Sequence, residues 1–255
     1  MFLRYVAIAA LLVAPLYAQA PAPPAAATAE KLPDARELIN RHVKAVGGRE
    51  AVLSKKSMHA VGTLAVPASG ITGPLEIWGA ANPDRVVLKM SVPGVGEIMD
   101  GFDGTHAWSV NPMTGPMLKG DKELVQTKLD ADFYSDLRDP AKYTSATTLE
   151  KTMFDDRECY KVALKRIDGT ADVEFYEVKS GLRAGQITTR DTSMGAMSMT
   201  TAHRGYKKFG DLLQASVVSQ KVMGIEQVIT ISQVEFDKVD PAVFELPAAI
   251  KALIK

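Results

Sequence analysis

The clearest structural signal in the chain lies in residues 71–102, which read ITGPLEIWGAANPDRVVLKMSVPGVGEIMDGF. Apolar and polar residues alternate through three short stretches, as they do in strands whose successive side chains point to opposite faces. The pairs Asn82-Pro83 and Pro93-Gly94 separate these stretches, and both are typical of turns. The pattern therefore predicts three consecutive strands of an antiparallel meander.

The same alternation extends outward from this stretch, back to Ser57 and forward almost to the end of the chain. Further turn pairs break it at Asp103-Gly104, Asp168-Gly169 and Ser180-Gly181. Roughly a dozen strands are predicted in this way. They cover 57–66, 71–80, 84–91, 95–102, 105–110, 143–151, 158–166, 171–179, 184–192, 196–209, 212–222 and 225–235.

Two segments have the helical period instead. Residues 34–46 begin with the capping pair Asp34 and Glu37 and end before Gly47-Gly48, which predicts an amphipathic helix. A second amphipathic helix is predicted over residues 121–137, inside the series of strands. Its apolar positions are Leu124, Val125, Leu129, Phe133 and Leu137.

These elements predict a mainly β fold of the α+β type. A sheet of about a dozen strands cannot lie flat, because strand twist curls it into a barrel or half-barrel. The two helices need an apolar surface for their stripes, and the concave face of the curled sheet offers one. A helix that fills a concavity only in part leaves an apolar pocket.

The beginning of the chain reads as an export signal. Arg4 precedes a run of about ten apolar residues, which is too short to span a bilayer, and we expect cleavage after Ala18. An uncleaved N-terminal anchor is the less favoured alternative. Residues 19–33 then form a Pro/Ala-rich linker, and residues 34–255 are expected to form one domain. A periplasmic location is predicted, with no membrane segment in the mature chain and no cysteine at the cleavage site for a lipid anchor.

Charge and cysteine content narrow the function further. Thirty basic residues balance thirty acidic ones, and both signs are scattered, which argues against nucleic acid or an anionic membrane as partner. Cys159 is the single cysteine and cannot form an internal disulfide. We therefore expect stability to come from a hydrophobic core, with Cys159 as a buried thiol.

Three short motifs resemble the LolA/LolB-like superfamily of bacterial periplasmic and outer-membrane lipoprotein carriers. They are LINRHVKAVGG at residues 38–48, DGFDGTHAW at 100–108 and VDPAVFELP at 239–247. The resemblance implies a half-barrel of about eleven antiparallel strands, closed by helices, whose apolar inner face accepts the acyl chains of lipids or lipoproteins.

Strand alternation also suggests which side chains could line such a cavity, since residues two apart share a face. The candidates are Leu75, Ile77, Val86, Leu88, Met90, Trp108, Tyr160, Val162, Leu164, Ile229 and Ile231, and the candidate lid positions are Leu124, Val125, Leu129 and Phe133. The same residues could equally fill an ordinary core, and the sequence leaves both readings open.

Metal and catalytic motifs are weak. Met194, Met197, Met199 and His203 could hold Cu(I) only if Gly195 forms a bulge, and apolar packing or a flexible lid loop is the favoured explanation. The four histidines are isolated, and no nucleophile elbow, phosphate loop or dinucleotide motif occurs. We therefore expect no cofactor and no catalytic residue.

The favoured function is that of an exported, non-catalytic, monomeric carrier or sensor that binds a lipid or lipoprotein acyl chain. A module for interaction or assembly of envelope proteins, with the cavity filled by its own side chains, is the alternative. A periplasmic Cu(I)-binding protein is a lesser one, and an enzyme is the least favoured.

Overall fold

Thirteen strands form one antiparallel sheet in the computed structural model, which describes residues 31–167, 169–192 and 195–254. The chain divides after Lys31 into two units, and every element below belongs to the second unit. The predicted signal peptide and nearly all of the predicted linker lie outside the described residues. The strands are β1 (Ser57–Val66), β2 (Ile71–Ala80), β3 (Arg85–Val92), β4 (Gly96–Phe102), β5 (Ala107–Asn111), β6 (Gly115–Lys119), β7 (Tyr143–Phe154), β8 (Arg157–Arg166), β9 (Ala171–Glu177), β10 (Arg183–Thr192), β11 (Gly195–Phe209), β12 (Leu212–Val222) and β13 (Ile225–Phe236).

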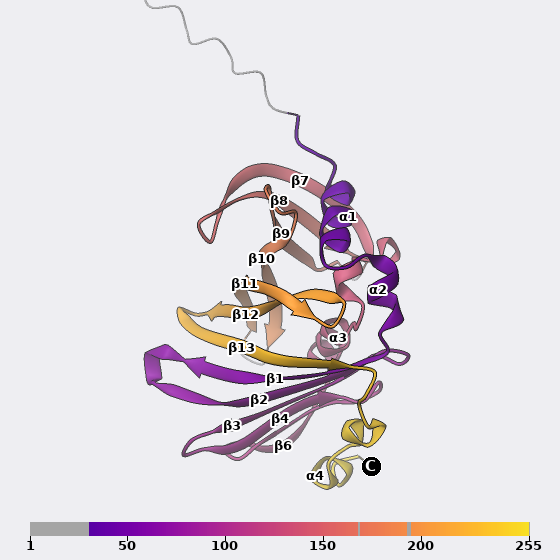
Figure 1. The fold of residues 1–255 in the computed structure, drawn as a ribbon. Helices are drawn as coiled ribbons and strands as arrows, with labels where there is room; N and C mark the ends of the chain where they lie inside the picture. The colour runs from indigo at the N-terminus through magenta and orange to yellow at the C-terminus, as the bar shows by residue number, and fades with distance from the viewer. Residues whose placement is uncertain (1–30, 168, 193–194, 255) are drawn as a thin grey trace, which may run out of the picture. The chain divides into compact units, whose positions relative to one another are not determined.

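The sheet is curved and open. Its strand order is β6-β5-β4-β3-β2-β1-β13-β12-β11-β10-β9-β8-β7, so that β6 and β7, which follow one another in the chain, lie at opposite edges (Figure 1). The expected half-barrel is therefore confirmed, but it has thirteen strands and not about eleven. Alternation missed β6, because a segment of five residues that contains Pro116 is too short to show a period. Proline is tolerated there because β6 is an edge strand.

A bulge in β1 allows two neighbouring strands to approach closely. The register between β1 and β13 shifts between Val61 and Gly62. A Cβ atom at Gly62 would lie 2.1 Å from the carbonyl oxygen of Thr230, so that only glycine fits this position. Bulges of this kind bend a strand and increase its twist, which helps the sheet to curl.

Helix α1 (Ala35–Ala45) confirms the first predicted helix. The carboxylate of Asp34 accepts hydrogen bonds from the backbone N–H groups of Arg36 at 2.8 Å and Glu37 at 3.2 Å, which caps the N-terminus. At the other end the N–H of Gly48 donates to the carbonyl of Val43, and Gly47 has a positive φ. Helix α2 (Arg49–Ser54) follows directly. Its six residues are too few to show a helical period in the sequence.

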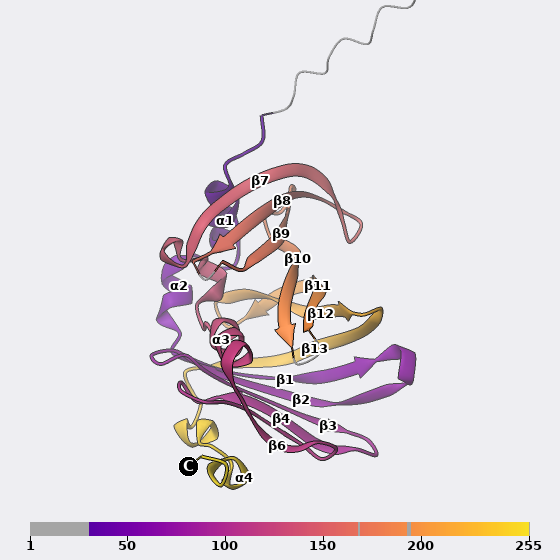
Figure 2. The same cartoon turned by 180° about the vertical axis from the view of Figure 1, so that it is seen from behind.

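The apolar stripe of α1 covers the part of the sheet formed by β8 and β9. Leu38, Ile39 and Val43 belong to one buried cluster with Val162 and Tyr176. In both views α1 lies beside β7, β8 and β9 (Figures 1 and 2). The prediction that a helix covers the sheet therefore holds for this half of the fold.

Helix α3 (Asp121–Asp130) is shorter than the predicted helix over 121–137. After Asp130 the chain changes direction, because the N–H of Phe133 donates to Asp84 and the hydroxyl of Tyr134 donates to the carbonyl of Lys55. The short 3₁₀ helices η2 (Ser135–Leu137) and η3 (Pro140–Lys142) complete the passage to β7. Figure 2 shows α3 between the β1–β6 strands and the β7–β10 strands.

The C-terminal segment covers the opposite face of the sheet. It contains the 3₁₀ helix η4 (Pro241–Phe244) and the short α-helix α4 (Ala248–Lys251). Another 3₁₀ helix, η1 (Pro67–Ser69), joins β1 to β2. Phe244 and Ile250 form a buried cluster with Val87 and Trp108. No helix in the described ranges is long and apolar enough to cross a membrane.

The packing of Ile250 should hold the C-terminal segment against the sheet. Ile250 is fully buried, whereas Leu253, one turn further on, is 43% exposed. We expect Ile250→Ala to lower the free energy of unfolding by about 2–5 kcal/mol, because it removes buried methyl groups and leaves a cavity. The matched change Leu253→Ala should alter it by no more than about 0.5 kcal/mol. Urea unfolding of both variants measures the difference, and equal losses would show that the segment does not contribute through packing.

Candidate ligand-binding site

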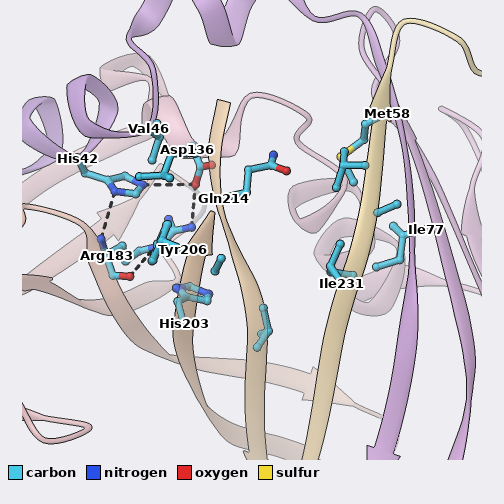
Figure 3. Close-up of a pocket in the computed structure, with 15 residues that line it drawn as sticks. His42, Val46, Met58, Ile77, Asp136, Arg183, His203, Tyr206, Gln214 and Ile231 are labelled. Carbon is cyan, nitrogen blue, oxygen red and sulfur yellow. Dashed lines mark hydrogen bonds and ion pairs between the residues drawn. The ribbon is translucent and has the colours of Figure 1, made fainter. Parts of the chain in front are cut away.

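A cavity of about 210 Å³ lies between α1, η2 and the concave side of strands β1, β2 and β10–β13. Figure 3 shows its lining, which divides into an apolar wall and a polar wall. The lining residues are His42, Val46, Met58, Ala60, Ile77, Asp136, Arg183, His203, Tyr206, Leu213, Gln214, Ala215, Val218, Ile231 and Val234.

The apolar wall comes mainly from the middle of the sheet. Met58, Ile77 and Ile231 face the cavity from β1, β2 and β13 (Figure 3). Ile77 and Ile231 belong to a packed group around the buried side chains of Ala60 and Phe209. This wall offers a surface on which an apolar chain can lie out of water.

The polar wall comes from α1, η2, β10 and β11. Arg183 is its centre: its Nη2 lies 2.7 Å from Oδ1 of Asp136, and its carbonyl accepts a hydrogen bond of 2.9 Å from the hydroxyl of Tyr206. The imidazoles of His42 and His203 complete the wall (Figure 3). Five polar side chains from four elements are thus brought to one side of the cavity.

The hydrogen bonds of His42 define its protonation. Its Nδ1 accepts a hydrogen bond of 3.1 Å from the backbone N–H of Arg183, so that the proton of the neutral ring resides on Nε2. Nε2 lies 3.8 Å from Oδ1 of Asp136, which is too long for a hydrogen bond. Burial lowers the pKa of His42 below its usual value, more than Asp136 raises it, which keeps the ring neutral.

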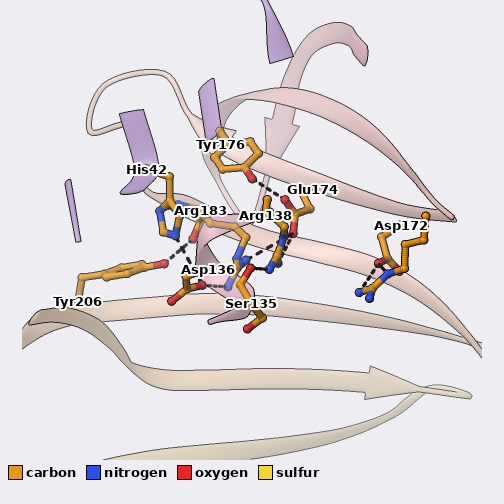
Figure 4. A network of polar contacts seen from close by, with 10 residues as sticks. His42, Ser135, Asp136, Arg138, Asp172, Glu174, Tyr176, Arg183 and Tyr206 are labelled. Atoms are coloured by element: carbon orange, nitrogen blue, oxygen red, sulfur yellow. Dashed lines mark hydrogen bonds and ion pairs between the residues drawn. The ribbon is translucent and has the colours of Figure 1, made fainter. Parts of the chain in front are cut away.

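A buried ion network supports the polar wall from behind (Figure 4). Glu174 on β9 accepts hydrogen bonds from Nε of Arg138 at 2.8 Å and from the hydroxyl of Tyr176, and Nη1 of Arg183 lies 3.4 Å from it. The carbonyl of Arg138 in turn accepts a hydrogen bond from Arg36 of α1. The network therefore joins α1, the segment after α3 and the sheet.

The contacts between arginine and carboxylate side chains determine the protonation states of the two carboxyl groups. Burial raises the pKa of the Glu174 carboxyl, but Arg138 and Arg183 outweigh that effect and set it at about 2. Burial likewise favours the neutral form of Asp136, and Arg183 reverses this, so that its pKa lies well below the usual value. Both carboxyl groups are therefore ionised at neutral pH.

Three nitrogen atoms of the polar wall have no hydrogen-bond partner within the described part of the chain. They are Nε2 of His42, Nε of Arg183 and Nδ1 of His203. All three atoms are closed off from solvent, so they lie behind the surface of the cavity. Nε of Arg85, Nε1 of Trp108 and the hydroxyls of Thr188 and Thr201, which do not line the cavity, are unpaired in the same way.

A smaller pocket of about 50 Å³ extends the cavity toward α2. It shares Met58, Asp136 and Gln214 with the main cavity, and adds Phe133 and Phe236. Phe133, which was predicted as part of a lid helix, thus lies beyond the end of α3 and beside the cavity extension.

The predicted lining residues are distributed over five environments. Ile77 and Ile231 line the cavity, and Ile229 packs in the same cluster. Leu75 is buried, and pairs with Met90 as Ile77 pairs with Leu88, so these four share one face of β2 and β3. Val86 packs in the cluster of Phe102, Ala107 and Ala131. Tyr160, Val162 and Leu164 lie in the cluster that α1 covers.

Trp108 lies elsewhere. It pairs with Gly101, which pairs with Val87, and this row lies on the face opposite to Leu88. The C-terminal segment covers it there. Alternation correctly placed Trp108 and Val110 on one face but could not show that this face is the outer one.

The predicted lid positions on α3 also differ among themselves. Leu124 packs against the cluster of Phe102 and Ala107, whereas Val125 is 53% exposed and points to solvent. Leu129 is half-buried.

The residues considered for a Cu(I) site lie on β11, except for Met194. Met197 and Met199 lie two residues apart on β11, and His203 lies further along the same strand with its ring at the cavity. Met194 is outside the described residues. Across the described ranges, no group of three or more His, Cys, Asp or Glu side chains is arranged to hold a metal ion. Cys159 is a buried thiol, as expected, and burial raises its pKa to about 11.

Sequence reasoning missed most of the polar wall. Asp136, Arg183 and Tyr206 meet only through the fold, and no local pattern marks them. His42 left a signal, because it occupies a position on the apolar stripe of α1, four residues after Leu38. A histidine in a buried stripe needs a hydrogen-bond partner, so this position predicts a polar contact between α1 and the sheet.

Comparisons with known proteins identify the fold. No family model matches the chain, and a search of curated proteins found no match. A solved DUF1329 family protein from Desulfovibrio piger superposes with a TM-score of 0.57 at 12% identity, over 84% of this chain and 98% of that one. A LolA superfamily protein from Nitrosomonas europaea gives 0.53 at 12% identity, over 84% and 99%.

A third structure agrees. The putative outer membrane lipoprotein-sorting protein domain from Vibrio parahaemolyticus gives a TM-score of 0.52 at 11% identity, over 83% of this chain and 96% of that one. The class is therefore that of curved antiparallel half-barrels with the fold of LolA superfamily proteins. This chain has that fold, and the resemblance found in its sequence is confirmed.

Removal of the Glu174 carboxylate should destabilise the ion network behind the polar wall. We expect Glu174→Gln to cost about 3–5 kcal/mol of unfolding free energy, because it leaves two buried guanidinium groups without their shared counterion. As a control, Glu158→Gln breaks the exposed ion pair between Glu158 and Lys151, at 3.0 Å, and should cost no more than about 1 kcal/mol. Denaturant titration compares them, and a Glu174 variant as stable as the control would contradict this account.

Acid should destabilise the protein through His203. Burial, followed by the charge of Arg183, lowers the pKa of His203 to about 3. Between that value and about 6.5, the unfolded chain binds a proton that the folded protein excludes, so that stability falls as the pH decreases. His203→Leu should therefore reduce the loss of unfolding free energy between about pH 7 and about pH 5 by about 2 kcal/mol. An unchanged pH dependence, measured by urea unfolding, would show that His203 titrates normally.

Proposed function

We propose that this protein is an exported, non-catalytic carrier that binds the acyl chain of a lipid or lipoprotein in the bacterial cell envelope. The observation that carries the proposal is the cavity at the concave side of the sheet, which joins an apolar wall to a polar wall. An apolar wall suits a hydrocarbon chain, and the polar wall gives its head group hydrogen-bonding partners.

The fold supports this proposal by analogy. Curved half-barrels of this kind include a LolA superfamily protein and a putative outer membrane lipoprotein-sorting domain, as their names state. The export signal read in residues 1–18 would bring the chain to the compartment in which an apolar cargo has to cross water.

The alternative is an assembly module whose interior is filled by its own side chains. Helix α1 does fill the half of the concave face formed by β8 and β9. The other half retains the cavity and its unpaired polar atoms. A filled interior would leave no such cavity, so the carrier is favoured.

The direct test is to isolate the full chain from its native compartment under mild conditions. Native mass spectrometry and lipid extraction should then detect a co-purified amphiphile, and the emptied protein should take up a fluorescent acyl probe. A homogeneous, ligand-free protein that also fails to take up the probe would contradict the proposal.

A substitution inside the cavity should block the probe. Ala215 and Val218 on β12 line the cavity, so the alternation is interrupted between them, opposite Gly205 with its positive φ. Val217 therefore lies on the opposite face, where it pairs with Arg204 and Thr230. We expect Ala215→Phe to lower the affinity for a fluorescent acyl probe by about tenfold or more, because the ring occupies the space of the ligand. Val217→Phe should leave the affinity unchanged, and equal effects in a fluorescence titration would place the probe outside this cavity.

A further inference from the structure

Four hairpin turns of the sheet lie on the side of the molecule away from α2. They join β1 to β2, β3 to β4, β5 to β6 and β12 to β13, whose strands are antiparallel neighbours in one continuous part of the sheet. Both views show these turns on the same side (Figures 1 and 2). We call them the hairpin tips, which are residues 66–71, 92–96, 111–115 and 222–225.

None of the hairpin tips contains a charged residue. Their sequences are VPASGI, VPGVG, NPMTG and VMGI. Met113, Met223 and Ile225 are 79%, 78% and 53% exposed, so that large apolar side chains project from the tips into water. Apolar side chains gathered at one exposed place are typical of a surface that contacts a partner or a membrane.

Met223 occupies a position that disfavours it. Its φ is 51° and that of Gly224 is 81°, and two successive positive φ angles are those of a tight hairpin turn for which Asn-Gly is the preferred pair. Methionine rarely adopts this conformation, whereas asparagine does so readily. The turn itself therefore gains nothing from the apolar side chain that it exposes.

The turns at the other end of these strands are built differently. Asp84 lies in the turn from β2 to β3, Asp103 in that from β4 to β5 and Asp211 in that from β11 to β12. All three carboxylates have hydrogen-bond or ion-pair partners. Acidic and small polar residues are the ordinary choice for turns, so turn chemistry does not account for the apolar tips.

The described charged residues nearest to the hairpin tips balance one another. Lys89 and Glu97 form an ion pair of 2.8 Å behind tip 92–96. Lys221 and Glu226 flank tip 222–225 and lie opposite each other on β12 and β13. In the neighbouring turn from β7 to β8, two acids are matched by two bases, which are Asp155, Asp156, Arg157 and Arg204. These groups add no net positive charge that would attract an anionic lipid surface.

The spacing of the hairpin tips favours lipid over protein as their partner. Successive tips are two strands apart, which is about 10 Å. The core of a protein interface is a contiguous, closely packed apolar patch, and separate tips do not form one. Lipid head groups and acyl chains can close around separate protrusions, as they do around the apolar face of an interfacial helix.

We propose that the hairpin tips dock this protein on the surface of an uncharged lipid bilayer, with Met113, Met223 and Ile225 at the boundary between head groups and acyl chains. This inference goes beyond the proposed function, because it concerns a membrane surface and not the ligand in the cavity. Since few side chains enter the bilayer, the docking is reversible.

The test is flotation of the isolated protein with vesicles of phosphatidylcholine, which has no net charge. We expect the wild-type protein to float with them, and the double variant Met113→Asp, Met223→Asp to partition at least about tenfold less, because its carboxylates remain in water. Addition of anionic phosphatidylglycerol should change wild-type partitioning by no more than about twofold. Absence of wild-type binding, or binding that requires the anionic lipid, would overturn the proposal.

Two further variants separate the tips from a general effect of charge or of folding. Val125→Asp places a carboxylate at a 53% exposed position of α3, away from the tips, and should partition as the wild type does. Met223→Asn should stabilise the fold and still weaken vesicle binding by about threefold. A loss in Val125→Asp equal to that of the double variant, or wild-type binding by Met223→Asn and the double variant, would contradict docking through the tips.

The other possible occupants give different results. Ala215→Phe, which fills the cavity, should float as the wild type does; if it does not, vesicle lipid binds in the cavity, and the inference fails while the proposed function stands. Sedimentation equilibrium should show one monomeric species for both the wild type and the double variant. A wild-type dimer that the double variant dissociates would identify a second copy of the chain as the partner and overturn the proposal.

Discussion

The buried carboxylate of Glu174 holds together the parts of the molecule that form the cavity. Its removal from water is compensated because two guanidinium groups and the hydroxyl of Tyr176 surround it. Arg138 thereby fixes the segment after α3 to the sheet, and its own carbonyl receives α1 through Arg36. Arg183 orients Asp136 and, through its backbone N–H, the ring of His42. One ion cluster thus sets the positions of α1, η2 and the polar wall.

The topology explains why a segment had to cross the concave side. Since β6 and β7 are consecutive in the chain but lie at opposite edges, the connection from Lys119 to Tyr143 runs from one edge to the other. Helix α3 makes this crossing, and α1 occupies the concave face at β8 and β9. These two helices cannot cover the whole of a curled sheet of thirteen strands. The space that remains lies at the middle strands, where β1 pairs with β13 and the cavity is found.

Local rules predicted the local parts of this structure. Alternation located twelve of the thirteen strands, and the cap at Asp34 with Gly47-Gly48 bounded α1 to within one residue. The same rules failed where tertiary contacts decide. The helical period after Asp130 continued, but contacts of Phe133 and Tyr134 turned the chain away. Alternation could tell which residues share a face with Trp108, but not that this face is the convex one. The polar wall depends on residues more than a hundred positions apart, such as His42 and Arg183, and no local pattern encodes that contact.

The incomplete pairing of the polar wall separates it from the ion network behind it. Arg138, Glu174 and Tyr176 satisfy one another, as buried polar groups in a stable core do. A few ångströms away, His42, Arg183 and His203 each keep an unpaired nitrogen in the described structure. Such atoms lower the stability of the fold, and apolar residues of similar size would avoid the cost. The hydroxyls of Thr188 and Thr201 and Nε1 of Trp108 are unpaired in the described ranges as well, so incomplete pairing is not confined to the polar wall. The cavity thus has polar side chains at one end only, and apolar side chains along the opposite wall.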